Sequence, residues 1–242
     1  MENQRISLVT GGSSGIGQAV TVALARRGDF VVFTYRNASR AAETAELVQA
    51  AGGMCQAEPC SIESLSDTAG LVRRIVREHG RIDCFAHCAA ISNVKTIDEI
   101  DEAEWDTMLD ANLKGPFFLT RVVCNTLKAR TSGQIVMITS IAGQRGGKFS
   151  GVHYSASKGG LETMMKCFAL LGAEYQVTCN AVSPGVADTP MSREEGIATD
   201  DIPLGRAAVP EEVADAVVFL LSEQARYITG TTLDVNGGQM MR

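Results

Sequence analysis

The sequence of 242 residues lacks any apolar run long enough to cross a bilayer, and it has no excess of basic residues. Its longest fully apolar segment is "AVVFLL" at 216–221, whereas a membrane-spanning helix needs about 20 apolar residues. The start has no basic region followed by a long apolar stretch, so we expect no signal peptide. The net charge of −6 disfavours attraction to phosphate backbones and anionic lipids. We therefore expect no nucleic acid and no membrane as partners.

Cysteines with the paired short spacings of a disulfide framework or a zinc site are also absent. The cysteines are odd in number, and most lie in apolar runs where cysteine behaves as a small hydrophobe. This usage predicts a cytoplasmic protein, because thiols stay reduced in that compartment. The seven are Cys55, Cys60, Cys84, Cys88, Cys124, Cys167 and Cys179.

Internal repeats, low-complexity tracts and linkers rich in proline or serine are absent as well. What the sequence does contain is 45% hydrophobic and 21% charged residues, close to the composition of an ordinary soluble globular protein. We therefore expect one continuous domain over residues 1–242.

Short apolar runs with strand character alternate with longer segments of helical spacing. The longer segments, such as "AVTVALARRG", carry apolar residues on one face and end in glycine, as helices packed on a sheet do. The strands are apolar on both faces, which a sheet covered by helices on each side requires. The pattern predicts an α/β fold, a doubly wound sandwich with strands near 5–9, 30–34, 54–58, 82–87, 134–139, 177–182 and 231–235.

A glycine-rich loop, "TGGSSGIG" at 10–17, lies between the first expected strand and an amphipathic helix. Gly11, Gly15 and Gly17 allow a tight turn and a close approach of the backbone to a pyrophosphate. The helix N-terminus adds free N–H groups and a partial positive charge. Ligands of open α/β sheets bind beyond the carboxyl ends of the strands, so this loop is predicted to bind a dinucleotide.

The end of the second expected strand, "FTYRNASR", contains no Asp or Glu. An acid at this place bonds the ribose hydroxyls of NAD, whereas a cation accepts the 2′-phosphate of NADP. Arg36 stands about where the acid would be, and Arg40 can assist from the next helix. We therefore predict NADP(H) as the cofactor, the alternative being that both arginines are solvated surface charges.

Tyr154 and Lys158 lie four positions apart in "HYSASK", so on a helix their side chains share one face. Taken alone, such a pair is more often a half-exposed tyrosine beside a solvated lysine. A phenol with a pKa near ~10 exchanges protons poorly until a nearby cation stabilises its anion, and Lys158 can be that cation. Ser140, at the end of the fifth expected strand, can hydrogen-bond a substrate carbonyl oxygen.

Five motifs in register resemble the short-chain dehydrogenase/reductase family across essentially the whole chain. They are "TGGSSGIG", the serine of "SIAG", "YSASK", "NAVSPGVADTP" and "ITGTTLDVNGG". The resemblance implies a Rossmann-like single domain with a mostly parallel seven-stranded sheet flanked by helices. Its cofactor-binding part would cover about 1–135, and its catalytic and substrate part about 136–242.

The resemblance also implies roles for single residues. Tyr154 would be the general acid in the reducing direction, Lys158 would lower its pKa and bind the nicotinamide ribose, and Ser140 would orient the carbonyl. Asn112, in "DANLKG", matches the family asparagine that anchors a water between Lys158 and bulk solvent; it can also bond backbone groups at a helix kink near Gly115. The implied cofactor contacts, besides Tyr154 and Lys158, are Gly11, Ser13, Ser14, Gly15, Ile16, Gly17, Arg36, Ser61, Ile62, Cys88, Ala89, Ala90, Pro184, Gly185, Val186 and Thr189.

The chain departs from the family pattern in three places. Relatives usually have Asn-Asn-Ala-Gly after the fourth strand, and this chain has "HCAA" at 87–90, where the methyl group of Ala90 could reduce cofactor affinity. Ser61 stands in place of an aspartate that contacts the adenine. The segment 191–203, a lid in relatives, is short and charged, which suggests an open pocket or a loop that orders with substrate. We expect no metal site, because the histidine and cysteine of "HCAA" lack further ligands.

Within the family the chain looks most like 3-oxoacyl-(acyl-carrier-protein) reductases, which reduce a β-keto thioester with NADPH in fatty-acid or polyketide synthesis. The substrate would then be a small-molecule or carrier-bound ketone, with Lys128 and Arg130 as candidate contacts for an acidic carrier protein. Relatives are commonly tetramers, and the apolar helix expected at 161–172, with Leu171 where relatives often have glutamate, predicts a homotetramer or a dimer.

Two other functions remain open. A dehydrogenase of another alcohol or ketone, such as a sugar, steroid or aromatic ketone, would use the same catalytic residues with a different lid. A non-catalytic NADP(H)-binding sensor or scaffold would use the same fold, although the presence of Asn112, Ser140, Tyr154 and Lys158 together argues against it.

Overall fold

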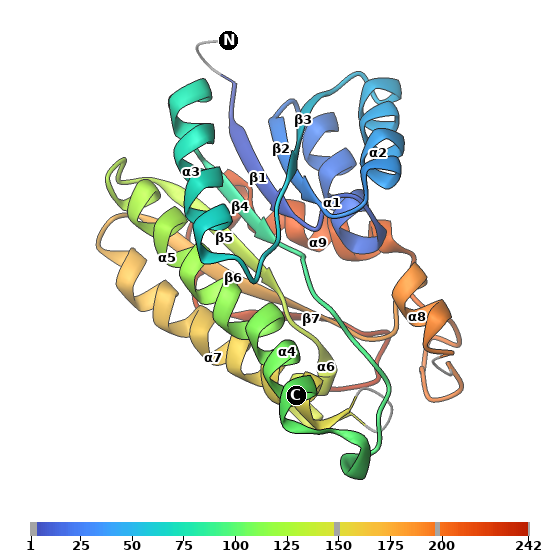
Figure 1. Ribbon diagram of the computed structural model, residues 1–242. Coiled ribbons are helices and arrows are strands. Elements are labelled where there is room, and N and C mark those ends of the chain that lie inside the picture. The colour runs from blue at the N-terminus through green and yellow to red at the C-terminus, as the bar shows by residue number, and fades with distance from the viewer. Residues whose placement is uncertain (1–3, 148–150, 197–198, 242) are drawn as a thin grey trace.

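Seven strands form one parallel sheet in the computed structural model, in the order β3-β2-β1-β4-β5-β6-β7 (Figure 1). The structure describes residues 4–147, 151–196 and 199–241. Each observed strand overlaps a predicted one, so the predicted positions are confirmed. The strands are β1 (Ile6–Thr10), β2 (Phe30–Tyr35), β3 (Met54–Pro59), β4 (Cys84–His87), β5 (Gly133–Ile138), β6 (Val177–Pro184) and β7 (Thr232–Val235).

Helices connect the strands and cover both faces of the sheet, which confirms the doubly wound sandwich. Helices α3, α5 and α7 pack on one face, and α1, α2 and α9 on the other (Figure 1). No helix of the described ranges has both the length and the apolar character needed to cross a membrane. The longer helices are α1 (Gly15–Arg26), α2 (Ala38–Ala50), α3 (Leu65–His79), α4 (Glu102–Leu109), α5 (Gly115–Lys128), α7 (Val152–Ala173) and α9 (Pro210–Leu220), and the shorter ones are α6 (Ile141–Arg145), α8 (Pro190–Glu194), η1 (Ile97–Glu99), η2 (Asp110–Lys114) and η3 (Glu223–Ala225).

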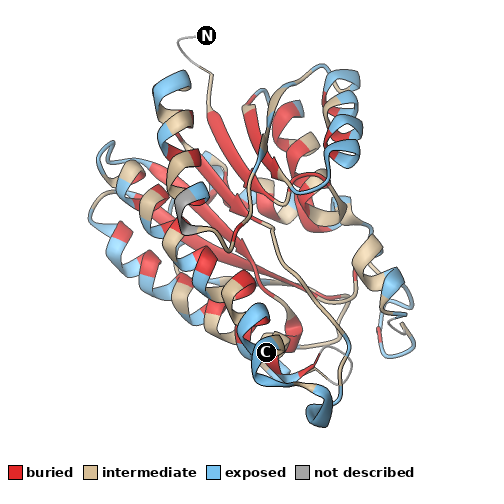
Figure 2. Cartoon of the chain, in the orientation of Figure 1, coloured by how far each residue is buried: buried red, intermediate tan, exposed pale blue. Residues whose placement is uncertain are grey.

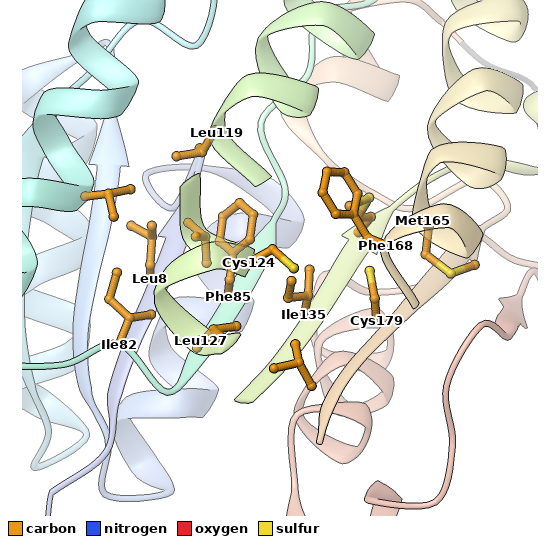
Figure 3. Packing of buried hydrophobic residues seen from close by; sticks show 14 of the residues in the cluster. Leu8, Ile82, Phe85, Leu119, Cys124, Leu127, Ile135, Met165, Phe168 and Cys179 are labelled. Carbon is orange, nitrogen blue, oxygen red and sulfur yellow. The ribbon is translucent and has the colours of Figure 1, made fainter. Parts of the chain in front are cut away.

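Both faces of the five inner strands of the sheet are buried, as their apolar sequences predict, whereas the edge strands β3 and β7 are partly exposed (Figure 2). Successive side chains of a strand point to opposite faces, so Ile135 packs under α5 and α7 while Val136 packs under α1 and α9. Figure 3 shows the first of these clusters, to which Phe85 of β4, Leu119 of α5 and Phe168 of α7 all belong. Each such side chain contributes roughly 1.5–3 kcal/mol by leaving water. This packing fixes the strand ends, where the site is built.

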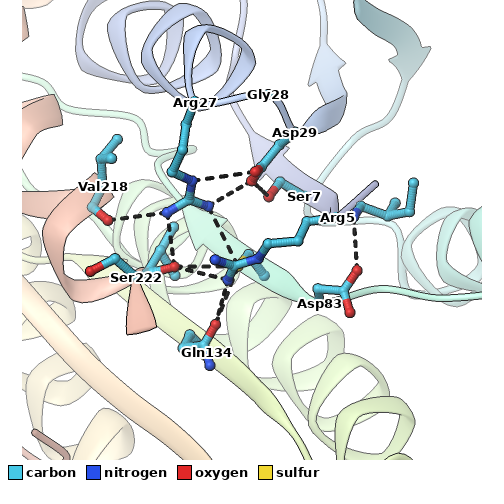
Figure 4. A network of polar contacts seen from close by, with 12 residues as sticks. Arg5, Ser7, Arg27, Gly28, Asp29, Asp83, Gln134, Val218 and Ser222 are labelled. Carbon is cyan, nitrogen blue, oxygen red and sulfur yellow. Dashed lines mark hydrogen bonds and ion pairs between the residues drawn. The ribbon is translucent and has the colours of Figure 1, made fainter. Parts of the chain in front are cut away.

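At the amino ends of the strands, two arginines hold the end of α9 to the sheet (Figure 4). Arg5 donates from Nη2 to Oε1 of Gln134 at 2.6 Å and to the carbonyl oxygen of Leu221 at 2.9 Å. Arg27 donates to the same carbonyl at 2.9 Å and pairs with the buried carboxylate of Asp29 at 2.6 Å. The last carbonyls of a helix lack intrahelical donors and favour cations, so the two guanidinium groups stabilise this end of α9.

Candidate active site

The loops that follow β1, β2, β3, β4, β5 and β6 enclose one cleft of about 960 Å³. That volume is near the upper end of the ~300–1,000 Å³ typical of ligand pockets. The cleft lies at the carboxyl ends of the strands, where the fold predicts it. The predicted site residues that line it are Gly11, Ser13, Ser14, Gly15, Ile16, Gly17, Arg36, Ile62, Cys88, Ala89, Ala90, Ser140, Tyr154, Lys158, Pro184, Gly185, Val186 and Thr189.

The glycine loop fits a pyrophosphate. Gly11 has a φ of +65°, and a Cβ atom there would lie 2.8 Å from the Cα atom of Ala89. A Cβ atom at Gly17 would overlap the carbonyl oxygen of Gly11. Helix α1 has no acid in its first turn, and its N-cap Ser14 makes no capping hydrogen bond within the described chain. The N–H groups of α1 and the Ser14 hydroxyl are thus available to an anion.

Arg36 and Arg40 line the cleft beyond β2, as the sequence predicts for an NADP site. The side chain of Arg36 is 63% exposed, and its Nη1 lies 3.9 Å from Oε1 of Glu63. Glu63, which follows β3, also lines the cleft, and sequence reasoning missed it. This end of the cleft therefore carries two cations and one carboxylate that competes for Arg36.

Ser61 departs from its predicted place. Its hydroxyl donates a short hydrogen bond to the carboxylate of Glu63, and it is missing from the described residues that line the cleft. Cys60 and Ile62, its chain neighbours, line the cleft instead. At the end of β3 the cleft is therefore lined by the apolar side chains of Cys60 and Ile62 and not by the expected hydroxyl of Ser61. That hydroxyl is hydrogen-bonded to the carboxylate of Glu63 instead.

The unusual "HCAA" segment is held to the end of β1 through a histidine. The ring of His87 is buried, and its Nδ1 lies 2.8 Å from the hydroxyl oxygen of Thr10. That oxygen accepts the backbone N–H groups of Cys88 at 3.2 Å and Ala89 at 3.3 Å, so its own proton is free to be donated to His87. Burial, and then the charge of Lys158, lower the pKa of His87 to about 3. His87 is therefore neutral at physiological pH.

Cys88 lies under the glycine loop and has no reactive character. A Cβ atom at Gly17 would lie 3.3 Å from the Cβ atom of Cys88, so this thiol packs close to the start of α1. Burial raises the pKa of Cys88 to about 12, an effect that Lys158 opposes only in part. The thiol stays protonated at neutral pH and acts as a small hydrophobe.

Ser140, Tyr154 and Lys158 meet where β5 ends and α7 begins. Oγ of Ser140 accepts the backbone N–H of Ala142 at 3.1 Å, which leaves the hydroxyl proton of Ser140 for another acceptor. Lys158 is 2% exposed, and its Nζ donates to the carbonyl oxygen of Ile138 at 3.0 Å. The same Nζ lies 5.7 Å from the centre of the Tyr154 ring. The structure thus brings the three predicted catalytic side chains together.

The ionisation of this group differs from the expected one. Burial raises the pKa of Tyr154 to about 12; a hydrogen bond with Ser140 lowers it, and the charge of Glu195 raises it. Burial lowers the pKa of Lys158 to about 8. The expected lowering of the Tyr154 pKa is thus not found, because burial dominates. Tyr154 keeps its proton at neutral pH, which suits an acid and not a base.

Asn112 lies behind the cleft, outside the described residues that line it. It is buried in η2, a wider π-type turn between α4 and α5. Its Oδ1 accepts the N–H of Ile91 at 2.9 Å, and its Nδ2 donates to the carbonyl oxygen of Ile91 at 2.8 Å and to Oγ of Ser157 at 3.3 Å. These partners lie in the loop after β4 and on α7, not at the kink near Gly115. Asn112 therefore ties that loop to the helix of Tyr154, and its role in a water relay stays a prediction.

The segment after β6 is held by a residue that sequence reasoning missed. Oε1 of Gln239 accepts the N–H of Val186 at 3.1 Å, and Gln239 lines the cleft. The methyl group of Thr189 would lie 3.2 Å from a Cβ atom at Gly15, so the two halves of the chain meet across the cleft. The "VNGG" motif before Gln239 was the available signal, but it does not reveal the contact with Val186.

The expected lid begins with α8, whose N-cap Thr189 accepts the N–H of Ser192 at 3.3 Å. Residues 197–198 of the segment 191–203 lie outside the described residues. The lid side of the cleft is acidic, and the only described lid-side cation that lines it is Arg145, which pairs with Asp201 at 3.4 Å. The carboxylates that line it are Glu194, Glu195, Asp200 and Asp201.

Lys128 and Arg130 do not lie near the cleft, which corrects their expected position. Helix α5 ends at Lys128 just before β5 begins, so both residues stand at the amino ends of the strands. Nζ of Lys128 lies 4.2 Å from the centre of the Tyr175 ring, and Arg130 lies 3.7 Å from Asp83. Within one chain they cannot border the opening of the cleft, because α5 runs antiparallel to the strands.

Comparison with known proteins decides the family. A solved short-chain type dehydrogenase/reductase from Mycobacterium ulcerans superposes with a TM-score of 0.92 at 30% identity, covering 98% of this chain and 90% of that one. A family model described as enoyl-(acyl carrier protein) reductase matches residues 11–240. The chain belongs to the short-chain dehydrogenase/reductase family. Membership confirms the predicted oxidoreductase, and enzymes of this family work with a nicotinamide cofactor.

Curated relatives of this short-chain dehydrogenase/reductase match over nearly their whole length. Acetoacetyl-CoA reductase of Allochromatium vinosum is 37% identical over 248 residues, which cover 98% of this chain and 99% of that one. The 3-oxoacyl-(acyl-carrier-protein) reductase FabG of Escherichia coli is 34% identical over 246 residues, which cover 98% of each. Both names describe reduction of a β-keto thioester.

Proposed function

We propose that the chain is an NADPH-dependent reductase of a β-keto thioester carried by acyl carrier protein or coenzyme A. The observation that carries the proposal is the meeting of Ser140, Tyr154 and the buried Lys158 inside a cleft whose far end carries Arg36 and Arg40. A protonated tyrosine and a protonated serine facing one cleft suit delivery of a proton to a ketone oxygen. The relatives supply the substrate class, because their names describe β-keto thioesters.

The site residues fit the cofactor along the whole cleft. The N-terminus of α1 and the Ser14 hydroxyl would hold the pyrophosphate, and Arg36 with Arg40 would hold the 2′-phosphate. Lys158 would donate to the nicotinamide ribose, since only one of its three N–H donors is used by Ile138. Bound in this way, NADPH would supply the hydride that adds to the ketone carbon.

The chain's own residues complete the reduction to an alcohol. The hydroxyl of Ser140 donates to the ketone oxygen and holds it beside the hydroxyl of Tyr154. Tyr154 then gives its proton to that oxygen as negative charge develops there. The positive charge of Lys158 stabilises the tyrosinate that remains until a proton from solvent replaces the one given. Asn112 keeps α7 and the loop after β4 in register during this exchange.

We further propose a cytoplasmic homotetramer. All seven cysteines are free, which suits a reducing compartment. Leu170 and Leu171 on α7 are 80% and 59% exposed, and Phe117 of α5, whose ring lies 6.2 Å from that of Phe168 on α7, is 39% exposed. An apolar surface of this kind favours association of like subunits.

The test is reduction of the N-acetylcysteamine thioester of acetoacetate with NADPH, and in parallel with NADH, followed as loss of reduced-cofactor absorbance. We expect turnover with NADPH, and a fall of about 10²–10⁴-fold in Tyr154→Phe with cofactor affinity retained. Turnover of the crotonyl thioester alone would assign the chain to enoyl reduction instead. Turnover of sugar, steroid or aromatic ketones alone would replace the thioester by another ketone, and tight NADPH binding without any turnover would favour a sensor.

A further inference from the structure

Glu195 places a carboxylate on the lid side of the catalytic group. It is the C-cap residue of α8, whose first turn is fixed by Thr189 and Pro190. It lines the same cleft as Tyr154 and as Ser92 of the loop after β4. Its negative charge acts on Tyr154 and raises the pKa of that phenol, so the two groups lie within electrostatic range of each other.

The Glu195 carboxylate is only partly satisfied. The hydroxyl of Ser92 forms a side-chain hydrogen bond with it. Its Oε1 is buried from solvent, and no donor of the described residues lies within hydrogen-bonding distance of that oxygen. A buried acceptor without a donor costs free energy, so an N–H or O–H group of a bound molecule would be stabilised here.

The cleft around Glu195 contains further carboxylates and cations that are paired with other groups. Burial raises the pKa of Glu195, Ser92 lowers it, and the neighbouring carboxylate of Glu194 raises it. The basic side chains nearby have other partners: Arg193 pairs with Asp188 at 2.6 Å, and Arg145 pairs with Asp201. No salt bridge of Glu195 is found among the described residues. An anion on the Glu195 side of Tyr154 would therefore meet a carboxylate that is not paired with a described cation, although the ammonium group of Lys158 lies near the Tyr154 ring.

We propose that Glu195 is a specificity-determining residue that excludes ketones with an anionic group beside the carbonyl and admits neutral ones, whose N–H or O–H donors it accepts. The proposal rests on the proposed function, because reduction requires the ketone oxygen to reach Tyr154. A substituent two or three bonds from that ketone then lies within range of Glu195. A β-keto ester or thioester is accepted there, and a free β-keto acid is repelled.

The first experiment compares methyl acetoacetate with acetoacetate, which share the ketone and differ in the charge beside it. We expect the wild type to prefer the ester in kcat/KM, and Glu195→Gln to reduce this preference about tenfold by gaining activity on acetoacetate, the size expected for loss of one nearby like charge. Glu194→Gln is the matched control, with the same change of charge on an exposed neighbouring residue, and should keep most of the wild-type preference. An unchanged preference in Glu195→Gln would overturn the proposal.

A second measurement separates recognition from turnover. Binding of 3-hydroxybutyrate and of its methyl ester to the protein saturated with NADP+ is measured by calorimetry for the same variants. Glu195→Gln should tighten binding of the acid about tenfold and leave that of the ester within about twofold. Turnover of neutral ketones with no effect of Glu195→Gln in either assay refutes the role of Glu195 alone. Failure of the wild type to reduce any ketone refutes the proposed function, and this inference with it.

Discussion

The hydroxyl of Thr10 donates a hydrogen bond to Nδ1 of His87 across 2.8 Å, at the place where β1 and β4 end side by side. Because that hydroxyl also accepts the N–H groups of Cys88 and Ala89, one contact sets both the orientation of the ring and the course of the loop beyond it. The family departure in "HCAA" is therefore a replacement in which an imidazole anchors the loop.

The burial of the His87 ring predicts acid sensitivity. The folded pKa of His87, about 3, lies below its unfolded value of about 6.5, so the unfolded chain alone binds a proton between these values. The free energy of unfolding then falls by ~1.4 kcal/mol for each pH unit below 6.5. In His87→Asn, the loss of stability between about pH 7.5 and about pH 5 should be about 2 kcal/mol smaller than in the wild type. Urea unfolding at both pH values measures it.

The matched control for this prediction is His79→Asn, which removes a histidine that is only partly buried at the end of α3. It should keep the wild-type dependence on pH. An equal dependence in His87→Asn and the wild type would show that His87 is protonated in the folded chain.

The pair of Arg36 and Glu63 predicts two opposite effects on cofactor affinity. Arg36→Glu should weaken NADPH binding by about 10–100-fold, the usual size for loss of a charge-assisted hydrogen bond, with little effect on NADH. Glu63→Gln should strengthen NADPH binding a few-fold, because Arg36 loses the carboxylate 3.9 Å away that competes with the phosphate. Fluorescence titration measures both, with Arg77→Glu on α3 as a charge-reversal control. Equal affinity of the wild type for NADPH and NADH would contradict the phosphate site.

The lowered pKa of Lys158 predicts that cofactor binding weakens at high pH. A pKa of about 8 means that the ammonium group loses its proton as the pH rises through that value. The Kd for NADPH should increase several-fold between about pH 7 and about pH 9 in the wild type, and stay flat in Lys158→Arg, whose guanidinium keeps its charge. A parallel increase in the variant would place the titration on another group.

The buried ion pair of Arg27 and Asp29 predicts a large loss of stability. Arg27→Ala leaves the carboxylate of Asp29, 3% exposed, without its cation and should lower the free energy of unfolding by about 3–5 kcal/mol. Adding Asp29→Asn should restore part of that loss, because the uncompensated charge is removed. Denaturant unfolding measures both, and Arg26→Ala, an exposed neighbour, should cost less than ~0.5 kcal/mol.

Thiol reactivity should follow exposure and pKa. Burial raises the pKa of Cys88 to about 12 and that of Cys60 to about 11, so neither should react with iodoacetamide in the native chain near neutral pH. Cys167 is exposed on α7 in the single chain and shares a helix face with Leu170 and Leu171, so it should be alkylated first when the proposed tetramer is dissociated. Peptide mass spectrometry of native and urea-unfolded protein distinguishes them, and rapid labelling of native Cys88 would show that its thiolate is stabilised.

Local sequence patterns are sufficient to predict most of the fold and the group of Ser140, Tyr154 and Lys158. Strand positions follow from apolar runs, and the meeting of Ser140 with Tyr154 and Lys158 follows from one strand end and one helical turn, both local features. The glycine loop is equally local, since its spacing alone determines the close backbone approach.

The remaining features depend on contacts between distant segments, which one sequence does not show. Three features depend on the relative positions of loops. They are the hydrogen bond of Ser61 with Glu63, the hydrogen bonds of Asn112 with Ile91, and the position of Glu195 in the cleft. The position of Lys128 depends on the antiparallel course of α5, and the ionisation of Tyr154 depends on its depth of burial. Contacts and burial of this kind do not follow from the spacing of residue types along the sequence, so no local pattern predicts them.

The strand order determines the sequence in which the sheet can assemble during synthesis of the chain. The segment through β4 contains the paired strands β3, β2, β1 and β4, and each later strand adds to the same growing edge. During synthesis the glycine loop at 10–17 and the residues Arg36 and Arg40 therefore emerge from the ribosome before Tyr154 does. Until β5 has been made, the apolar edge of β4 has no neighbour, and an unpaired strand edge of this kind is prone to aggregation.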